Sequence, residues 1–544
     1  MYPRDQNILF MLPFSVPFPP TYTPDHLFYS PGLSHKDLHL LTSSGVALMF
    51  SSALFTAFGL LALGIAFKRR RMRARLPPGP PGLFLLGNLR DMPHDKPHWL
   101  TYEAWAEKFG DIVYVEVLGR SMVILNSLAA VTELLEKRSA SYSDRPPMPM
   151  ANDLMGWHWD MVHMRYSNWW RIHRKTFHQS FQSRAVPAYY PIQMKATRTL
   201  LQQLSINPTG FVDHIRHHAG NVILNVVYGY ELQSENDPYV HLAHEAMKGL
   251  NQAVHPGSFF VDFLPALRYL PSWFPGAGFK RKAKIWAKSS LALRDIPFEN
   301  LKTSIAAGTA IPSFVADNLE KLRKQTPPAD EEIIKNCAGI AYLAGSDTTV
   351  SLILVWVLAM TLNPEVQARA RAEVDAVIGD RLPDFSDRER SSFPYIQAML
   401  QETMRWAPVT PLAIPHMNMV DDEYNGYHIP AGTTVIGNIH AILHDATMFP
   451  EPHEFKPERF LSQDGEKSPL RPEAVAFGFG RRICPGRDLA LNSAWIVIVS
   501  ILKTYIIDKA VDSNGNYIVP KVEFSPGTVS WVQSITLLYN NDNV

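Results

Sequence analysis

The sequence predicts a mainly α-helical fold with small β-sheets, preceded by one transmembrane helix, and three observations support this prediction. Long helical patterns fill the middle of the 544-residue chain, strand-like runs are short, and an uncharged apolar stretch lies close to the amino terminus. Hydrophobic residues make up 46% of the chain, which is enough for a large buried core.

The apolar stretch runs from Gly45 to Phe67 and contains no charged side chain. At ~1.5 Å per residue it spans roughly 34 Å, enough to cross a bilayer core of about 30 Å. The basic cluster Lys68–Arg75 follows at once, and such clusters stay on the cytosolic side. We therefore expect a lumenal extension over residues 1–44, a transmembrane helix over 45–67, and a single-pass protein of the endoplasmic reticulum membrane whose main domain is cytosolic. The alternative is a buried core helix.

Residues 68–82 are expected to form a basic stop-transfer segment and a proline-rich hinge. The run LPPGPPG, Leu76–Gly82, cannot continue a helix because proline fixes φ and lacks an N–H. No linker-like composition follows, so residues 83–544 are predicted to form one large domain.

Within this domain the longest helical patterns carry recognisable start signals. Apolar spacing predicts helices over Glu331–Thr361, Pro364–Ile378 and Phe393–Trp406. Asn363 and Pro364 supply a cap residue and a first-turn proline, which are typical of a helix start. Strands are predicted over Ile112–Val117 and Met122–Leu125, with further β structure within His428–Ile439 and Val522–Leu538.

Charge and cysteine content exclude several classes of protein. The 52 basic and 51 acidic residues give a formal charge of +1, without the basic excess of a nucleic-acid binder. Cys337 and Cys484 are the only cysteines, so a disulfide framework or a CxxC site is excluded. His214 and His218 have a spacing that can bind zinc, but no third ligand accompanies them, and we expect both to be solvated.

The segment FGFGRRICPG, Phe477–Gly486, surrounds Cys484 with glycines and arginines. A cysteine thiolate on iron donates electron density that favours O–O cleavage, and backbone N–H groups of a glycine-rich turn can protect and tune it. Gly480 and Gly486 permit the tight turn and close approach that this requires. The segment resembles the haem-binding loop of cytochromes P450, FxxGxRxCxG, at every fixed position.

This resemblance implies that haem b is the cofactor and that Cys484 holds its iron. It also implies that Phe477 packs near the sulfur and keeps water away, and that Arg482 pairs with a haem propionate.

Two further segments resemble elements that contact the propionates in this family. In WRIHR, Trp170 and Arg174 stand one helical turn apart, so both can donate to one carboxylate. His416, which follows Ala-Ile-Pro, is similar to the position that often contacts the other propionate.

A structural network is implied by two more motifs. Glu402 and Arg405 resemble the ExxR pair, whose two side chains share a helix face. In the family this pair is buried with the arginine of a later PERF-like segment, here Arg459, and supports the haem loop. Taken alone, such a pair is more typical of an exposed surface.

The segment AGSDTT, Ala344–Thr349, resembles the oxygen-activation segment of the family's long central helix. Asp347 and Thr348 are then expected to be catalytic, as an acid and a hydroxyl that relay protons for the reduction of dioxygen. The alternative is a plain helix interior in which the threonine hydroxyl bonds back to the preceding turn.

The resemblance covers roughly Leu76 to Leu538, and two segments are similar to a fungal subgroup that includes O-methylsterigmatocystin oxidoreductase and tryptamine 4-monooxygenase. It implies a monooxygenase that inserts one atom of O2 into an organic substrate.

The chain carries no flavin or nicotinamide fingerprint, so we expect electrons from NADPH through a membrane-bound NADPH-cytochrome reductase. Three basic residues are candidates for attracting this acidic partner: Arg171, Lys175 and Arg481. The alternatives are a haem-thiolate isomerase or dehydratase, and a non-catalytic haem-binding sensor.

The substrate is expected to be largely apolar, such as a terpenoid, a polyketide or a polycyclic aromatic in secondary metabolism or xenobiotic oxidation. Four segments that line the cavity in this family are poor in charge here. The residues expected to line it are Met148, Met150, Leu154, Met155, Trp157, Trp159, Ala344, Gly345, Val409, Pro411, Leu412, Ala413, Ile414, Phe524, Pro526 and Val529.

Overall fold

The computed structural model describes residues 75–540, apart from 94–95, 234–236, 255–256, 325–329, 391–392, 462–469 and 534–536. The lumenal extension and the transmembrane helix predicted over residues 1–67 lie outside the described residues. Arg75–Val544 clusters as one compact unit.

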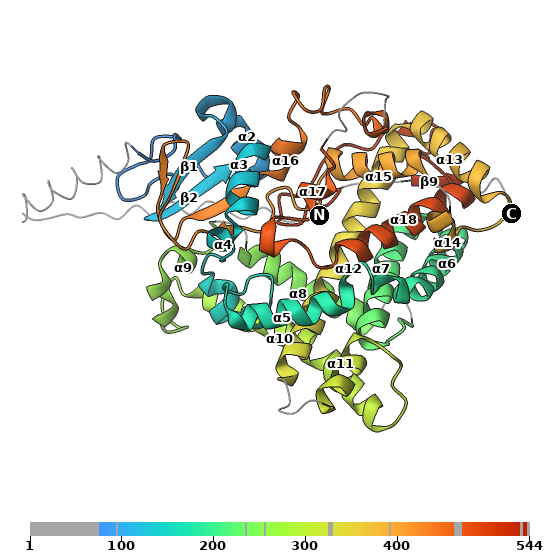
Figure 1. Cartoon of the computed structure of the whole chain (residues 1–544), viewed down its shortest axis with the longest axis horizontal. Helices are drawn as coiled ribbons and strands as arrows, with labels where there is room; N and C mark the ends of the chain where they lie inside the picture. Colours follow the sequence, from blue (N-terminus) through green and yellow to red (C-terminus); the bar gives the residue numbers. More distant parts are fainter. Residues whose placement is uncertain are drawn as a thin grey trace, which may run out of the picture. The chain divides into compact units, whose positions relative to one another are not determined.

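Helices dominate this unit, as Figure 1 shows. The first group consists of α2 (His98–Phe109), α3 (Leu128–Val131), α4 (Ser139–Tyr142), α5 (Asn168–Phe181), α6 (Tyr190–Ile206), α7 (Phe211–Tyr228), α8 (Pro238–Val254), α9 (Phe260–Phe263) and α10 (Gly278–Ala306). The second consists of α11 (Phe314–Arg323), α12 (Glu331–Leu362), α13 (Pro364–Ile378), α14 (Phe385–Arg390), α15 (Pro394–Trp406), α16 (Ile439–Leu443), α17 (Glu473–Ala476) and α18 (Arg487–Thr504). The predicted mainly helical fold is confirmed, and the three long predicted helices match α12, α13 and α15 within one residue at each end.

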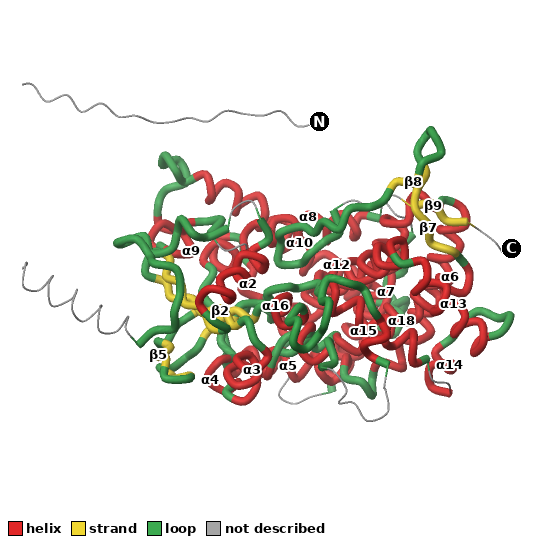
Figure 2. The backbone as a smooth tube through the Cα atoms, turned by 90° about the horizontal axis from the view of Figure 1, so that it is seen from above, coloured by secondary structure: helices red, strands yellow, loops and turns green. Residues whose placement is uncertain are grey.

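Three small sheets lie at the edges of the helical body (Figure 2). The strands are β1 (Ile112–Val117), β2 (Arg120–Leu125), β3 (His416–Met417), β4 (Asp422–Tyr424), β5 (Tyr427–Ile429), β6 (Thr434–Gly437), β7 (Ile506–Val511), β8 (Tyr517–Ile518) and β9 (Leu537–Asn540). The largest sheet has the order β1-β2-β6-β3, in which β2 and β6 are parallel and the other pairs are antiparallel. The β1–β2 hairpin turns at Leu118 and Gly119, which both have positive φ, as a tight two-residue turn requires.

The strand predictions at the carboxyl-terminal half are only partly right. The run His428–Ile439 does not form one strand: it contains the end of β5, all of β6 and the first residue of α16. The turn Pro430–Thr433 separates the two strands, with the Thr433 N–H donating to the Pro430 carbonyl. Proline and glycine at positions 430 and 432 are turn formers that split this apolar run.

The helix α12 forms the centre of the core. It is the one helix in the described part of the chain that is long and apolar enough to span a membrane, but most of its apolar window is buried inside the protein. One hydrophobic cluster covers its first part, up to Leu343, and a second covers its last part, from Val350. Between these two clusters, residues 344–348 are only half-buried. This short segment is therefore the part of the middle of α12 that is not fully packed against neighbouring elements.

Candidate active site

The loop that carries Cys484 lies between α17 and α18. The Cys484 N–H donates to the Phe477 carbonyl at 2.8 Å, which closes the loop around the cysteine. Gly480 has φ +53°, and a Cβ at this position would collide with the carbonyl oxygen of Leu135, so only glycine fits. At Gly486 a Cβ would make an ordinary 3.9 Å contact with the Cys484 Sγ, so close packing alone does not require glycine there.

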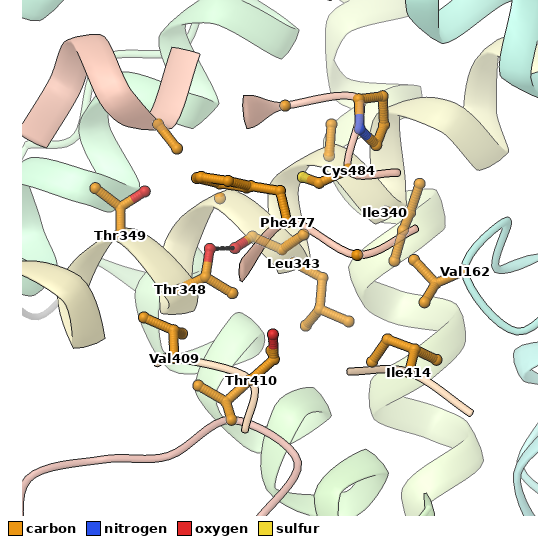
Figure 3. A pocket seen from close by; sticks show the side chains of 18 of the residues that line it. Val162, Ile340, Leu343, Thr348, Thr349, Val409, Thr410, Ile414, Phe477 and Cys484 are labelled. Carbon is orange, nitrogen blue, oxygen red and sulfur yellow. Dashed lines mark hydrogen bonds between the residues drawn. The ribbon is translucent and has the colours of Figure 1, made fainter. Parts of the chain in front are cut away.

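The Cys484 sulfur faces a cavity of about 330 Å³ that reaches from α18 to α12. In Figure 3, Cys484 and Phe477 lie across this cavity from Val409, Thr410 and Ile414. Protein atoms surround the Cys484 side chain, and its accessible surface is the part that borders the cavity.

Two opposing effects act on the Cys484 thiol. Burial raises the pKa of the thiol above its usual value, and the Gly486 N–H and the positive charges of Arg174 and Arg487 offset this only in part. The helix α18 begins immediately after this loop, and its positive end favours a thiolate as well. The loop by itself therefore favours the neutral thiol, and a bound metal cation would be the charge that stabilises the thiolate.

Three arginines border the same cavity: Arg145, Arg174 and Arg482. Burial lowers the pKa of each guanidinium, that of Arg482 to about 10. Arg145 and Arg482 donate to backbone carbonyls only, and none of the three has an ion pair with a carboxylate among the described residues. The charges of Asp144 and Asp160 oppose the lowering of the pKa at Arg145 and Arg482, but neither carboxylate forms an ion pair with these guanidinium groups. Buried cations with so little direct compensation are costly, so this cluster is suited to an anionic ligand with two carboxylates.

The other two residues expected at the propionates also border the cavity. Trp170 lies against Arg482, whose guanidinium carbon is 4.3 Å from the ring centroid. His416 is buried, and its Nδ1 lies 2.7 Å from the Tyr142 carbonyl. Burial, followed by the charge of Arg145, holds the pKa of His416 well below its usual range, so the ring is neutral and Nε2 is an acceptor. A hydrogen bond from His416 to a carboxylate would need a second proton on the ring, and this contact stays a prediction.

Glu402, Arg405 and Arg459 form a buried network beside the loop. Glu402 accepts from Arg405 Nε at 2.7 Å, from Arg405 Nη2 at 2.9 Å and from Arg459 Nε at 3.1 Å. Arg405 also donates to the carbonyls of Leu443, Pro452 and Glu454. The surface-pair alternative is therefore wrong, because Glu402 and Arg405 are fully buried.

The network connects to the cysteine loop through α15. Gln401, next to Glu402 on this helix, donates to Glu473 at the start of α17, at 3.1 Å. Because Phe477 follows α17 directly, the network fixes the segment that leads into the cysteine loop.

Thr348 and Asp347 lie on α12 but face different spaces. Thr348 borders the main cavity, and its hydroxyl donates to the Ala344 carbonyl at 3.0 Å, so the back-bonded arrangement is present at a cavity-facing residue (Figure 3). Asp347 does not border that cavity; it borders a smaller one between α7, α8 and α12 that also includes Arg216 and His244. The Asp347 Oδ2 is buried without a hydrogen-bond partner among the described residues, and burial raises the pKa of this carboxyl to about 7, opposed by the charge of Arg216.

The predicted cavity lining is right for three of the four segments and wrong for the first. Ala344, Gly345, Val409, Ala413, Ile414 and Val529 border the cavity, whereas Pro411, Leu412, Phe524 and Pro526 do not. None of the six residues predicted between Met148 and Trp159 borders it, and Met150, Met155, Trp157 and Trp159 pack into the core instead. The same loop reaches the cavity a few residues later, through Asp160, Met161, Val162 and His163.

The expectation that His214 and His218 are solvated is also wrong. Both are buried on α7, where His214 Nε2 lies 2.7 Å from the Asn207 carbonyl and His218 Nε2 lies 3.3 Å from Thr197 Oγ1. Burial, followed by the charge of His217, lowers the pKa of His218 to about 3. The described residues contain no group of three or more His, Cys, Asp or Glu side chains that could hold a metal ion.

Together these residues fit haem b. The sulfur of Cys484 can bind the iron from one side, and Arg145, Arg174 and Arg482 can pair with the two propionates. Phe477, Leu489 and Ile340 supply apolar walls, and the cavity continues beyond them towards α8.

Comparisons with known proteins agree with this fit. The family model described as cytochrome P450 matches residues 77–521. A cytochrome P450 monooxygenase of Armillaria gallica is 43% identical over 466 residues, which cover 85% of this chain and 91% of that protein. A second from Postia placenta is 40% identical over 495 residues, covering 91% and 94%. The tryptamine 4-monooxygenase of Psilocybe cyanescens is 41% identical over 468 residues, covering 84% and 91%, so the predicted resemblance to its subgroup is confirmed.

Proposed function

The chain belongs to the cytochrome P450 family and is a haem-thiolate monooxygenase, and on this premise we propose that it oxidises a largely apolar organic substrate with electrons from NADPH. The reaction is RH + O2 + NADPH + H⁺ → ROH + H2O + NADP⁺, in which a C–H bond is broken and an O–H and a C–O bond form in the product. The observation that carries the proposal is the Cys484 sulfur facing an enclosed, mainly apolar cavity whose far wall includes Thr348. When bound at Cys484, haem supplies the activation of dioxygen, which protein side chains alone cannot provide.

The protein's own residues then bind the substrate and manage protons. The apolar wall of the cavity includes Val162, Ile340, Leu343, Val409, Ala413, Ile414 and Val529. A ligand gains affinity there by losing contact with water, at about 25 cal/mol per Å² before the costs of binding. We therefore favour a terpenoid, a polyketide or a polycyclic aromatic as substrate, in secondary metabolism or xenobiotic oxidation.

Difference spectra of the haem-loaded protein test this substrate class. Terpenoids and polycyclic aromatics should produce spin-state shifts at micromolar concentrations, because they displace water from an apolar cavity. Small polar amines and acids should produce weak shifts or none. Tight shifts from the polar compounds alone would refute the proposal.

Thr348 and Asp347 are proposed to pass protons during turnover. A carboxyl whose pKa is raised to about 7 can both give and regain a proton near neutral pH, and the Thr348 hydroxyl borders the cavity on the adjacent position of α12. Thr348→Ala and Asp347→Asn should retain haem but divert NADPH oxidation to peroxide and water. The ratio of product formed to NADPH consumed should fall by about 10²-fold or more, since a positioned proton donor typically contributes about 10²–10⁴-fold to the step it serves.

Thr361→Ala is the matched control for these variants. Thr361 also lies on α12 and its hydroxyl donates to the Val357 carbonyl at 2.8 Å, but it does not border the cavity. Its replacement should leave coupling unchanged. Wild-type coupling in both Thr348→Ala and Asp347→Asn would exclude the relay.

An acidic flavoprotein reductase is the proposed electron donor. Arg171, Lys175 and Arg481 are exposed, and the first and last of these both lie against the Tyr166 ring. Exposed positive charge of this kind raises the rate at which an acidic partner associates and makes that rate depend on salt.

The membrane of the endoplasmic reticulum is the proposed location, with the catalytic domain in the cytosol. The apolar stretch 45–67 and its basic flank support a single-pass anchor. Two exposed apolar side chains offer a second contact: Phe84, near the start of the described chain, is 86% exposed, and Trp273, shortly before α10, is 78% exposed. The region of Phe84 borders the β1–β2 hairpin, because the Leu118 N–H of the turn donates to the Leu86 carbonyl.

Protease protection on sealed microsomes checks this orientation. A tag at the carboxyl terminus should be digested without detergent, because the catalytic domain is on the outside. A tag at the amino terminus should be protected until detergent is added. A protected carboxyl-terminal tag would contradict the orientation.

A further inference from the structure

Asp160 and His163 form a hydrogen bond in the wall of the main cavity. His163 Nδ1 lies 2.6 Å from Asp160 Oδ2, and Asp160 Oδ1 accepts from the Val162 N–H at 2.7 Å. Asp160 is fully buried and His163 nearly so, and both border the cavity. The carboxylate therefore fixes the imidazole in one orientation.

The hydrogen bond with Asp160 determines which nitrogen of His163 carries the proton. A carboxylate oxygen is an acceptor, so the contact assigns the proton to Nδ1. Nε2 is then the ring nitrogen left to accept a hydrogen bond from another group. Among the described residues Nε2 has no hydrogen-bond partner, so it is available to a ligand in the cavity.

The segment that holds His163 is braced by the two buried arginines. Arg145 donates to the carbonyls of Val162 and Ile414, and Arg482 donates to those of Met161 and Met164. These contacts join the segment to the residues after α15 and to the cysteine loop, so the position of His163 is fixed from both sides. The guanidinium groups can donate to a haem propionate. His163 Nε2, as an acceptor, would repel a propionate and is suited to a different ligand.

We propose that His163 is the polar anchor of the substrate cavity, where Nε2 accepts a hydrogen bond from a hydroxyl or N–H group of an otherwise apolar substrate. Asp160 is its positioning residue, because it sets the tautomer and the direction of the ring. The substrate class is thereby narrowed to apolar molecules with a hydrogen-bond donor, such as a terpenoid alcohol or a phenol. This inference rests on the proposed function, since it assumes that the cavity binds the substrate.

Matched pairs of ligands that differ in one donor test the anchor. The probes are farnesol with its methyl ether, and 1-naphthol with 1-methoxynaphthalene, each titrated into the haem-loaded protein by difference spectroscopy. The wild type should bind at least one alcohol roughly 3- to 10-fold more tightly than its ether, the range expected for one net hydrogen bond. In His163→Phe this preference should disappear while the affinity for the ethers stays within about twofold, because the ring volume is kept and only the acceptor is lost.

His163→Gln and His158→Phe complete the design. The glutamine carbonyl is an acceptor, so His163→Gln should recover part of the preference for alcohols. His158 lies on the same loop but is exposed and does not border the cavity, so His158→Phe should behave as the wild type.

Three results would overturn the anchor. If the wild type binds alcohols and ethers equally well, the proposal that His163 anchors the substrate is wrong, whereas the proposal of an apolar substrate still holds. No spin-state shift from any of the four probes would contradict the apolar-substrate proposal and the anchor with it. If His163→Phe instead shifts the haem propionate vibrations in the resonance Raman spectrum and keeps the preference for alcohols, the residue serves the cofactor.

Discussion

Replacement of Cys484 by histidine is expected to abolish the strongly red-shifted Soret band of the reduced carbon monoxide complex. The band requires a thiolate opposite the carbon monoxide, and an imidazole is a neutral nitrogen ligand that lacks its electron donation. Arg145, Arg174 and Arg482 remain in place around the cavity, so the variant should still retain some haem. Monooxygenase turnover should fall below detection.

Cys337→Ala is the matched control, because Cys337 is the other cysteine of the chain. It is fully buried on α12, and its Sγ lies 3.5 Å from the His173 carbonyl, remote from an open ligand position. Its replacement should keep the red-shifted band at full intensity. If the band persists in Cys484→His, the assignment of the iron ligand is wrong.

The second large effect is expected at Glu402. Its carboxylate compensates the fully buried Arg405 and also accepts from Arg459 and from the Lys456 N–H at 2.8 Å. Glu402→Ala leaves a buried guanidinium without a counter-ion, which should lower the free energy of unfolding by about 3–5 kcal/mol. Because the network holds α15 against the start of α17, haem should be lost at lower denaturant concentration than in the wild type.

An exposed ion pair provides the comparison for Glu402. Glu320 and Lys324 stand one turn apart on α11 with their charged groups 2.6 Å apart, and both side chains are largely exposed. Glu320→Ala should leave the denaturation midpoint close to that of the wild type, as is usual for exposed pairs. Denaturant titration of both variants decides the matter: equal losses of stability would mean that the Glu402 network is not the support that its burial indicates.

The features that the sequence predicted well are those encoded over a few neighbouring residues. The helix α13 begins at Pro364 after Asn363, and the loop around Cys484 carries its glycine, arginine and cysteine within ten positions. Local spacing and start signals are sufficient for such elements, because the interactions that define them are local too.

The facing of Asp347 depends on the elements packed around α12 and could not be read from its spacing alone. Successive residues on an α-helix are rotated by about 100°, yet Thr348 and Thr349 both border the main cavity, whereas Asp347 borders the smaller one. The family motif places Asp347 and Thr348 together in sequence, but Asp347 borders the small cavity next to α7 and α8, and Thr348 borders the main cavity that Cys484 also borders.

Arg145 and the Asp160–His163 pair could not be predicted in this way. Arg145 reaches the cavity because it donates to the carbonyls of Ile414 and Pro415, which lie 269 and 270 positions further along the chain. The loop from Met148 to Trp159 looked like cavity lining because it is rich in methionine and tryptophan, yet these side chains fill the core. Contacts with residues far along the chain decide which part of this loop packs in the core and which part borders the cavity. The amino-acid composition of the loop does not reveal this division.

Incorporation of labelled oxygen tests the central claim most directly. The protein is supplied with NADPH, a reductase, ¹⁸O2 and the apolar ligand that gives the largest spin-state shift, and the product is analysed by mass spectrometry. The account predicts a product that carries one ¹⁸O atom, forms only with NADPH, and is lost in Cys484→His. A product that forms without NADPH and contains no added oxygen atom would contradict the monooxygenase assignment and favour an isomerase or dehydratase. A new oxygen atom that comes from water would contradict the assignment as well.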